Sequence, residues 1–231
     1  MNENTQMMIY QAASWIIPLV IAIVFHEVAH GLVARYYGDM TAANAGRLTL
    51  NPIRHVDPVG TIILPLILAV TGAPVFGWAK GVPVNDQKMR NPRWNMVVVA
   101  AAGPLSNIIL ALIGAGLIVV LSIATKEGGG DVANFVLLNL YNFIAINLFL
   151  ALFNMLPIPP FDGSKVLAGI LPPALGARFR SLDRMGMLIA IALLVVIPSV
   201  FPSANIIGPL ISAPVIWVFE QISLVISAAS G

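Results

Sequence analysis

The chain has 231 residues, of which 58% are hydrophobic and only 10% are charged, with 12 Lys and Arg residues against 10 Asp and Glu residues. Ordinary soluble domains carry about 25% charged residues, so this composition indicates an integral membrane protein and gives no sign of nucleic-acid binding. The chain has no cysteine, which excludes disulfides and thiolate ligands and leaves any metal to histidine and carboxylate side chains.

Apolar runs long enough to cross a bilayer alternate with loops rich in Pro, Gly and charge. Six spans are predicted in chain order, at residues 14–35, 59–76, 94–124, 132–156, 184–201 and 206–228. The run at 59–76 contains two prolines and either crosses or re-enters the membrane, and the run at 184–201 is near the lower limit of ~17 residues. Segments 44–58 and 76–85 are predicted to be extended loops or short hairpins. The predicted fold class is an all-α membrane protein, a polytopic bundle of about six transmembrane helices with short extended or β segments in its loops.

The Lys and Arg residues can be divided between the two membrane faces if all six runs cross. One face then holds four of them, which are Arg35, Arg47, Arg54 and Lys126. The opposite face holds the other eight, which are Lys80, Lys88, Arg90, Arg93, Lys165, Arg178, Arg180 and Arg184. Because cytoplasmic loops carry an excess of Lys and Arg, this division predicts a multi-pass protein with cytoplasmic N- and C-termini.

The first run contains the sequence HEVAH, whose charged residue costs roughly 2.5 to 3.5 kcal/mol at the centre of a bilayer. His26 and His30 lie four residues apart on one helical face, so both can direct a nitrogen at a common point. Glu27 lies about 100° further round the helix, where it can reach a water on the metal without being a ligand. The pattern predicts a zinc site for hydrolysis, because zinc lowers the pKa of its water towards ~7 and a carboxylate can take the proton. The alternative is a set of polar contacts between helices.

Two histidines leave a catalytic zinc site short of a third protein ligand. His55 and the acidic residues are the candidates, and Asp162 has the most suitable setting. It follows Pro157, Pro159 and Pro160, which cannot all remain helical, so the fourth span must unwind there. Irregular backbone at membrane depth requires a protein or water-lined cavity, which favours Asp162 as a ligand. An aspartate at an interfacial turn is the competing interpretation.

The motif HEVAH, followed about 130 residues later by NMLPIPPFDG, resembles the site-2 protease family of intramembrane zinc metalloproteases, whose signatures are HExxH and NxxPxPxxDG. The connecting segments LTLNPIRHVDPVGT, FGWAKGVPVN and RNPRWNMVVVAAAGPLSN look like those of the compact bacterial and archaeal members without a regulatory domain. Two positions depart from the expected pattern, since Gly81 and Asp86 stand where proline is expected. The resemblance covers most of residues 14–168.

The resemblance implies a ligand set and a base. His26, His30 and Asp162 take the places of the ligands to one zinc ion per chain, and Glu27 takes the place of the general base. The implied reaction is hydrolysis of peptide bonds within or near transmembrane segments of membrane proteins, with single-span helices as the expected substrates.

Three further residues receive expected roles near the substrate. Asn154 opens the second signature and matches an asparagine that positions the substrate, and Asn107 is a similar candidate. Both asparagines can instead hydrogen-bond between helices. His55 lies in a loop that the family places near the catalytic cleft, although a loop histidine is commonly just solvated.

One transmembrane metalloprotease domain is expected over residues 1–231, with a catalytic core at about 14–168 and accessory helices at about 184–228. The expected location is the lipid bilayer of a prokaryotic inner membrane. Two rival functions remain open, a metal-binding membrane transporter and a protein that binds membrane helices without cutting them.

Overall fold

The computed structural model describes residues 3–71, 77–124, 130–193 and 207–230. Within these ranges the regular structure is entirely helical and contains no β-strand. Four described helices are long and apolar enough to cross a membrane: α1 (Glu3–Tyr36), α4 (Pro92–Ala124), α5 (Gly130–Asn154) and α10 (Ile207–Ser230). An all-α membrane protein is therefore confirmed as the fold class.

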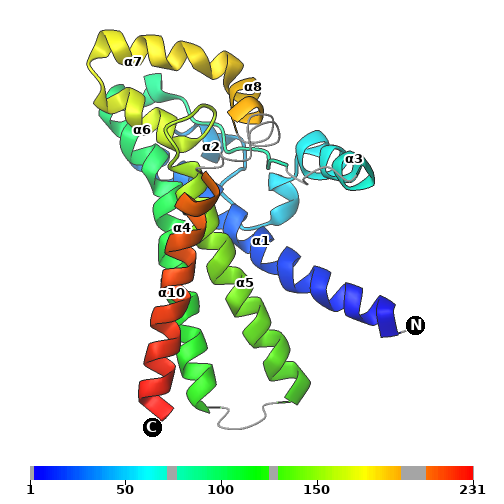
Figure 1. Ribbon diagram of the computed structural model, residues 1–231. Coiled ribbons are helices and arrows are strands. Elements are labelled where there is room, and N and C mark those ends of the chain that lie inside the picture. The colour runs from blue at the N-terminus through cyan, green and yellow to red at the C-terminus, as the bar shows by residue number, and fades with distance from the viewer. Residues whose placement is uncertain (1–2, 72–76, 125–129, 194–206, 231) are drawn as a thin grey trace.

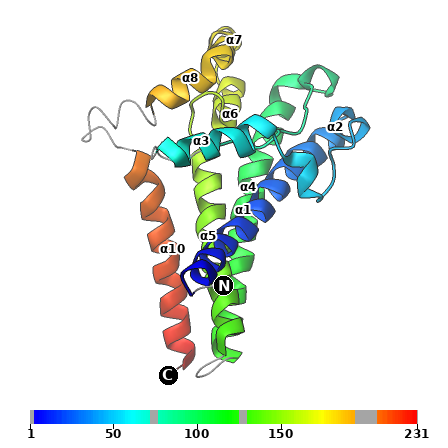
Figure 2. The ribbon, with the colours of Figure 1, turned by 90° about the vertical axis from the view of Figure 1, so that its right-hand side faces the viewer.

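Shorter elements connect these helices at one end of the bundle (Figures 1 and 2). Between α1 and α4 lie α2 (Thr41–Asn44), η1 (Pro52–His55), η2 (Pro58–Ile63), α3 (Leu64–Thr71) and η3 (Asp86–Lys88). Between α5 and α10 lie α6 (Asp162–Ile170), α7 (Pro173–Arg180), η4 (Ser181–Met185) and α8 (Gly186–Ile191). The end of α4, the start of α5 and the end of α10 lie at the opposite end of the bundle.

Helix α4 is the centre of the bundle and packs against α1, α5, α6 and α10. Buried aliphatic side chains of α4, α5 and α10 form one core cluster, namely Ala111, Ile118, Ile144 and Ile222. Buried asparagines add hydrogen bonds between helices: Asn142 Nδ2 on α5 donates to the Ser14 carbonyl oxygen on α1 at 2.8 Å. Such bonds help membrane helices associate, because lipid offers the amide no competing partner.

Helix α5 ends where the prolines require it to end. Asn154 is its last residue, and Pro157, Pro159 and Pro160 follow in a turn that leads directly into α6 at Asp162. A proline in the interior of a helix removes one hydrogen bond and clashes with the preceding turn. The predicted unwinding of the fourth span is therefore present, and it places the start of α6 beside the bundle.

The run at 59–76 does not form a long helix in the described residues. It folds as the π-helical η2 of six residues, followed without a break by the eight-residue α3. These 14 residues rise no more than about 21 Å against a hydrocarbon core of about 30 Å. The end of α1 and the start of α4 lie at the same end of the bundle in both views. A crossing helix at 59–76 is therefore not confirmed among the described residues, and the alternative, a run that re-enters the membrane, stays a prediction.

The structure describes only part of the other short predicted span, residues 184–201. Residues 184–193 contain the end of η4 and α8, while residues 194–201 lie outside the described ranges. The end of α5 and the start of α10 share one end of the bundle. Six crossing helices are thus not confirmed, and four are present among the described residues.

Where the structure describes them, the predicted extended segments 44–58 and 76–85 form no strand, and part of the first segment is the helix η1. Two main-chain hydrogen bonds join the second segment to η2 and η1. Trp78 N donates to Gly60 O at 3.1 Å, and Lys80 N donates to His55 O at 2.9 Å. Residues 77–85 are accordingly held against η1 and η2 without a sheet.

Candidate active site

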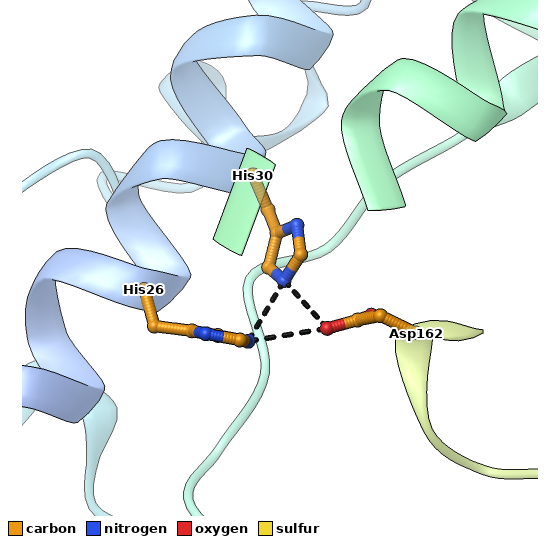
Figure 3. Close-up of side chains that lie close together, drawn as sticks. All are labelled: His26, His30 and Asp162. Atoms are coloured by element: carbon orange, nitrogen blue, oxygen red, sulfur yellow. Dashed lines mark hydrogen bonds and ion pairs between the residues drawn. The ribbon is translucent and has the colours of Figure 1, made fainter. Parts of the chain in front are cut away.

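His26, His30 and Asp162 meet in a buried cluster between α1 and the start of α6 (Figure 3). Asp162 Oδ2 lies 3.2 Å from His26 Nε2 and 3.1 Å from His30 Nε2, and the two Nε2 atoms are 3.0 Å apart. The three side chains come from positions up to 136 residues apart in the chain. Their exposed fractions are only 5 to 8%, so water does not satisfy these polar groups.

The second nitrogen of each imidazole is held by an oxygen. Asn107 Nδ2 donates to Asn147 Oδ1 at 2.8 Å and to Ala22 O at 3.2 Å, so Asn107 Oδ1 is the acceptor that faces His26. His26 Nδ1 donates to it at 2.6 Å, and His30 Nδ1 donates to the Val99 carbonyl oxygen at 2.7 Å. A neutral imidazole that donates from Nδ1 carries a lone pair on Nε2. Both Nε2 atoms are therefore prepared as ligands.

This cluster fits a zinc ion. Two lone pairs and a carboxylate oxygen within about 3 Å repel one another unless a cation lies among them. Ligands at about 2.0 to 2.1 Å from a tetrahedral zinc ion lie about 3.3 Å from each other, close to the distances in this cluster. Two imidazoles and one carboxylate form a ligand set that zinc hydrolases use with an open fourth position.

The other oxygen of Asp162 is engaged by Lys165, whose Nζ donates to Oδ1 at 3.0 Å. Lys165 lies three residues further along α6, on the same helical face. The carboxylate therefore presents a single oxygen, Oδ2, to the histidines. The sequence contained a signal for this pairing in the i, i+3 spacing, which the sequence-based prediction did not use.

Two glycines leave room for the cluster. A Cβ at Gly103 on α4 would lie 2.4 Å from His30 Nε2 and 2.6 Å from His26 Cε1. A Cβ at Gly163 would lie 2.2 Å from the Met155 carbonyl oxygen. Larger side chains at either position would displace the histidine rings or the turn that carries Asp162.

Glu27 does not join the three-residue cluster. Its side chain is half-buried, and Oε2 accepts a hydrogen bond from the Val82 main-chain N–H at 2.7 Å. The segment 77–85, far from Glu27 in sequence, is thereby held against the helix that carries the HEVAH motif. Glu27 is thus the sequence neighbour of His26 and stands outside the cluster of His26, His30 and Asp162.

The three other predicted site residues lie in different settings. Asn107 contacts the His26 ring, so its contacts are those of a residue that orients the histidine. Asn154 donates to the Leu150 carbonyl oxygen of its own helix at 3.0 Å. His55 is buried, and its Nε2 lies 2.9 Å from the Thr49 carbonyl oxygen. Neither Asn154 nor His55 belongs to the described metal cluster.

The fold and the site together define a membrane protein with a buried cluster of two histidines and one carboxylate that can hold a metal ion, next to a glutamate. The family model described as Peptidase family M50 matches residues 14–197. The chain therefore belongs to this family, the site-2 protease family of intramembrane zinc metalloproteases. Zinc is the cofactor of the site.

Relatives in bacteria and archaea are named as zinc metalloproteases. The chain is 39% identical over 180 residues to "Putative zinc metalloprotease YwhC" of Bacillus subtilis, a match that covers 78% of this chain and 79% of the relative. It is 28% identical to Rip2 of Mycolicibacterium smegmatis and 35% identical to MJ0611 of Methanocaldococcus jannaschii, both named in the same way. These matches cover 79% and 62% of this chain but only 65% and 63% of the relatives, less than two thirds of their length. No solved structure matches the chain significantly.

Proposed function

We propose that this protein hydrolyses peptide bonds within or next to the transmembrane segments of membrane proteins, with His26, His30 and Asp162 as zinc ligands and Glu27 as the general base. The observation that carries the proposal is the convergence of Nε2, Nε2 and Oδ2 within 3.2 Å of one another in a buried site on apolar helices. A purely structural contact between helices does not require three lone-pair atoms to face one another.

Each residue has a separate task in this mechanism. When bound, zinc supplies a Lewis acid that polarises the scissile carbonyl group and activates water. The histidines hold their Nε2 atoms in place through the hydrogen bonds of Nδ1 to Asn107 and Val99. Glu27 accepts the proton of the attacking water and later returns it to the leaving amine. The buried site limits the entry of bulk water to the reacting groups.

The proposed substrates are single-span membrane helices that unwind locally, because a helical peptide bond is shielded by its own turn. Residues 77–85 can pair with the unwound segment as an added strand. Trp78 N and Lys80 N both donate towards η1 and η2, and the two-residue period of an extended chain directs the N–H of Ala79 to the other side. An Ala79→Pro variant that cleaves as fast as the wild type would count against this pairing.

The distribution of charge supports an orientation opposite to the one expected from six crossings. Eleven of the twelve Lys and Arg residues lie at or between the ends of helices on the side of the short elements, seven in residues 35–93 and four in residues 165–184. Lys126 alone lies in the connection between α4 and α5. The positive-inside rule then assigns the end with the short elements to the cytoplasm of a prokaryotic cell, and both termini to the other side. The chain is further proposed to be a single transmembrane domain, whose catalytic core spans about residues 14–168.

The proposal is tested with purified protein in detergent and a tagged single-span substrate whose helix contains a Gly–Pro break. We expect one zinc per chain in the wild type, loss of zinc in His26→Ala and Asp162→Ala, and retention of zinc in Glu27→Gln. Glu27→Gln should nevertheless lose cleavage by at least about 10²-fold, because it cannot take the proton. A Glu27→Gln variant that cleaves normally would exclude this mechanism. Zinc uptake into vesicles by the same variant would favour the transporter, and undiminished substrate binding by a wild type that never cleaves would favour the non-cleaving binder.

A further inference from the structure

The proposed general base is held by a main-chain N–H. Val82 N donates to Glu27 Oε2 at 2.7 Å, which fixes one carboxylate oxygen and leaves Oε1 to exchange a proton. A free glutamate side chain has several rotamers, and ordering it costs conformational entropy. The position of Val82 therefore decides whether Glu27 is already oriented before the substrate arrives.

Val82 belongs to a segment without regular secondary structure, so its position depends on contacts outside the segment. Towards its C-terminal side the nearest anchor is Asn85 N, which donates to Asp39 Oδ2 at 2.6 Å. Towards its N-terminal side Lys80 N donates to His55 O at 2.9 Å. Neither bond orients the peptide units between Lys80 and Val82.

Arg47 supplies that orientation. Its guanidinium Nη2 donates to the Lys80 carbonyl oxygen at 2.5 Å and reaches the Gly81 carbonyl oxygen at 3.4 Å. These are the carbonyls of the two residues directly before Val82. Arg47 is only 8% exposed, and a hydrogen bond from a charged donor is roughly twice as strong as one between neutral groups.

The segment also lies directly on the catalytic helix. A Cβ at Gly31, one helical turn beyond Glu27, would lie 2.9 Å from Val82 Cγ1 and 2.4 Å from Leu48 Cδ2. Leu48 is the neighbour of Arg47 in the chain. Residues 47–48 and residues 80–82 therefore pack together on the face of α1 that carries Glu27.

We infer that Arg47 is a positioning residue for Glu27. Through the carbonyl oxygens of Lys80 and Gly81 it holds the Val82 N–H against Glu27 Oε2, and it thereby directs Oε1 towards the water that Glu27 deprotonates. Arg47 touches neither the metal ligands nor the reacting atoms. The inference rests on the proposed function, because it concerns the base of that reaction.

The test compares zinc-loaded wild type with Arg47→Met, Arg47→Lys and the matched control Arg54→Met. Arg54 is an exposed arginine in η1, so its substitution removes the same charge nearby without removing the contact to Lys80 and Gly81. For Arg47→Met we expect kcat to fall about 10²-fold, the size of effect produced by a misplacement of about 1 Å. KM should change less than about twofold, and zinc content should equal that of the wild type. Arg47→Lys should recover part of kcat, since an ammonium can still donate to one carbonyl oxygen.

Amide hydrogen exchange provides a readout that does not depend on activity. We expect faster exchange in the peptide containing Val82 in Arg47→Met, and no change in Arg54→Met. If Arg47→Met does not fold, Val82→Pro removes the donor itself and should give the same loss of kcat with zinc retained. Unchanged kcat, a raised KM at constant kcat, or unchanged exchange at Val82 would each overturn the inference while the wild type still cleaves. A wild type that binds zinc and cleaves nothing would overturn the proposed function as well.

Discussion

At the scale of single residues, the proposed metal site depends on the hydrogen bonds of those ligand atoms that would not bind the metal. Nδ1 of each histidine and Oδ1 of Asp162 are all engaged by the protein. These bonds select the tautomer and the ring orientation, and they leave one converging lone pair on each ligand. Asn107 is the clearest case, because its amide also joins α4 to α1 and α5.

Replacement of Asn107 by Leu should weaken zinc binding by about 10- to 100-fold, because His26 Nδ1–H loses its acceptor and the ring loses its orientation. The measurement is zinc affinity by chelator competition. Asn142→Leu is the matched control, since Asn142 is also a buried asparagine that bonds between helices but contacts Ser14 instead of the site. Equal zinc affinities in the two variants would refute the orienting role of Asn107.

At the scale of elements, the segment that reaches Glu27 is tied to the end of α1 by Asp39. This carboxylate is fully buried and accepts hydrogen bonds from Thr41 N, Thr41 Oγ1 and Asn85 N. Burial raises the pKa of Asp39, but the hydrogen bonds from Asn85 and Thr41 outweigh burial, so its pKa lies below the ordinary value of 3.8. The ionised form of Asp39 therefore stabilises the fold.

The stabilisation from Asp39 should be complete above its unfolded pKa of 3.8 and should be lost as the pH falls towards the lower folded pKa. Asp39→Asn should lower the free energy of unfolding by about 1 to 3 kcal/mol at pH 7, because an amide NH₂ would face the N–H of Asn85. The measurement is denaturant unfolding in detergent at pH 7 and at pH 3, where the difference from wild type should shrink.

Asp131→Asn serves as the control for Asp39→Asn. Asp131 lies exposed in the first turn of α5, so its substitution should change the free energy of unfolding by no more than about 0.5 kcal/mol. A difference between Asp39→Asn and wild type that is the same at both pH values would contradict the role of the ionised carboxylate.

At the scale of the whole molecule, Arg93 shows how the two sides of the site are kept together. It lies in the first turn of α4, and it donates from Nε to Gly169 O at 2.7 Å and from Nη2 to Leu171 O at 2.6 Å. These carbonyls are at the C-terminal end of α6, the helix that begins with Asp162. The central helix of the bundle is thereby connected to the C-terminal end of α6, whose first residue is Asp162.

The orientation proposed for the bundle can be measured directly, because the chain has no native cysteine. In intact cells a membrane-impermeant maleimide should label Asp131→Cys, at the start of α5, and should label Ile53→Cys, in η1, only after lysis. Both positions are exposed. Labelling of Ile53→Cys as well as Asp131→Cys in intact cells would restore the cytoplasmic termini expected from six crossings, which place residues 36–58 outside.

The sequence predicted the local features of the site and of the fold well. The spacing of His26 and His30 places them on one face in any helix, and the prolines after Asn154 end α5 in any surroundings. The contacts of Asn154 and His55 could not be predicted in this way. A side chain can hydrogen-bond to its own helix, to a neighbouring loop or to a substrate, and the sequence alone does not distinguish these partners.

What the sequence determined by itself was the membrane class, the four long spans and the pair of histidines, because composition, apolar length and helical period act within one segment. Only the tertiary structure decided that the described part of the run at 59–76 folds as the short η2 and α3, that Asn107 faces His26 and that Val82 reaches Glu27. The physical reason is that an apolar run gains as much by packing at the end of a bundle as by crossing it. Which of these it does depends on the surfaces that other segments present.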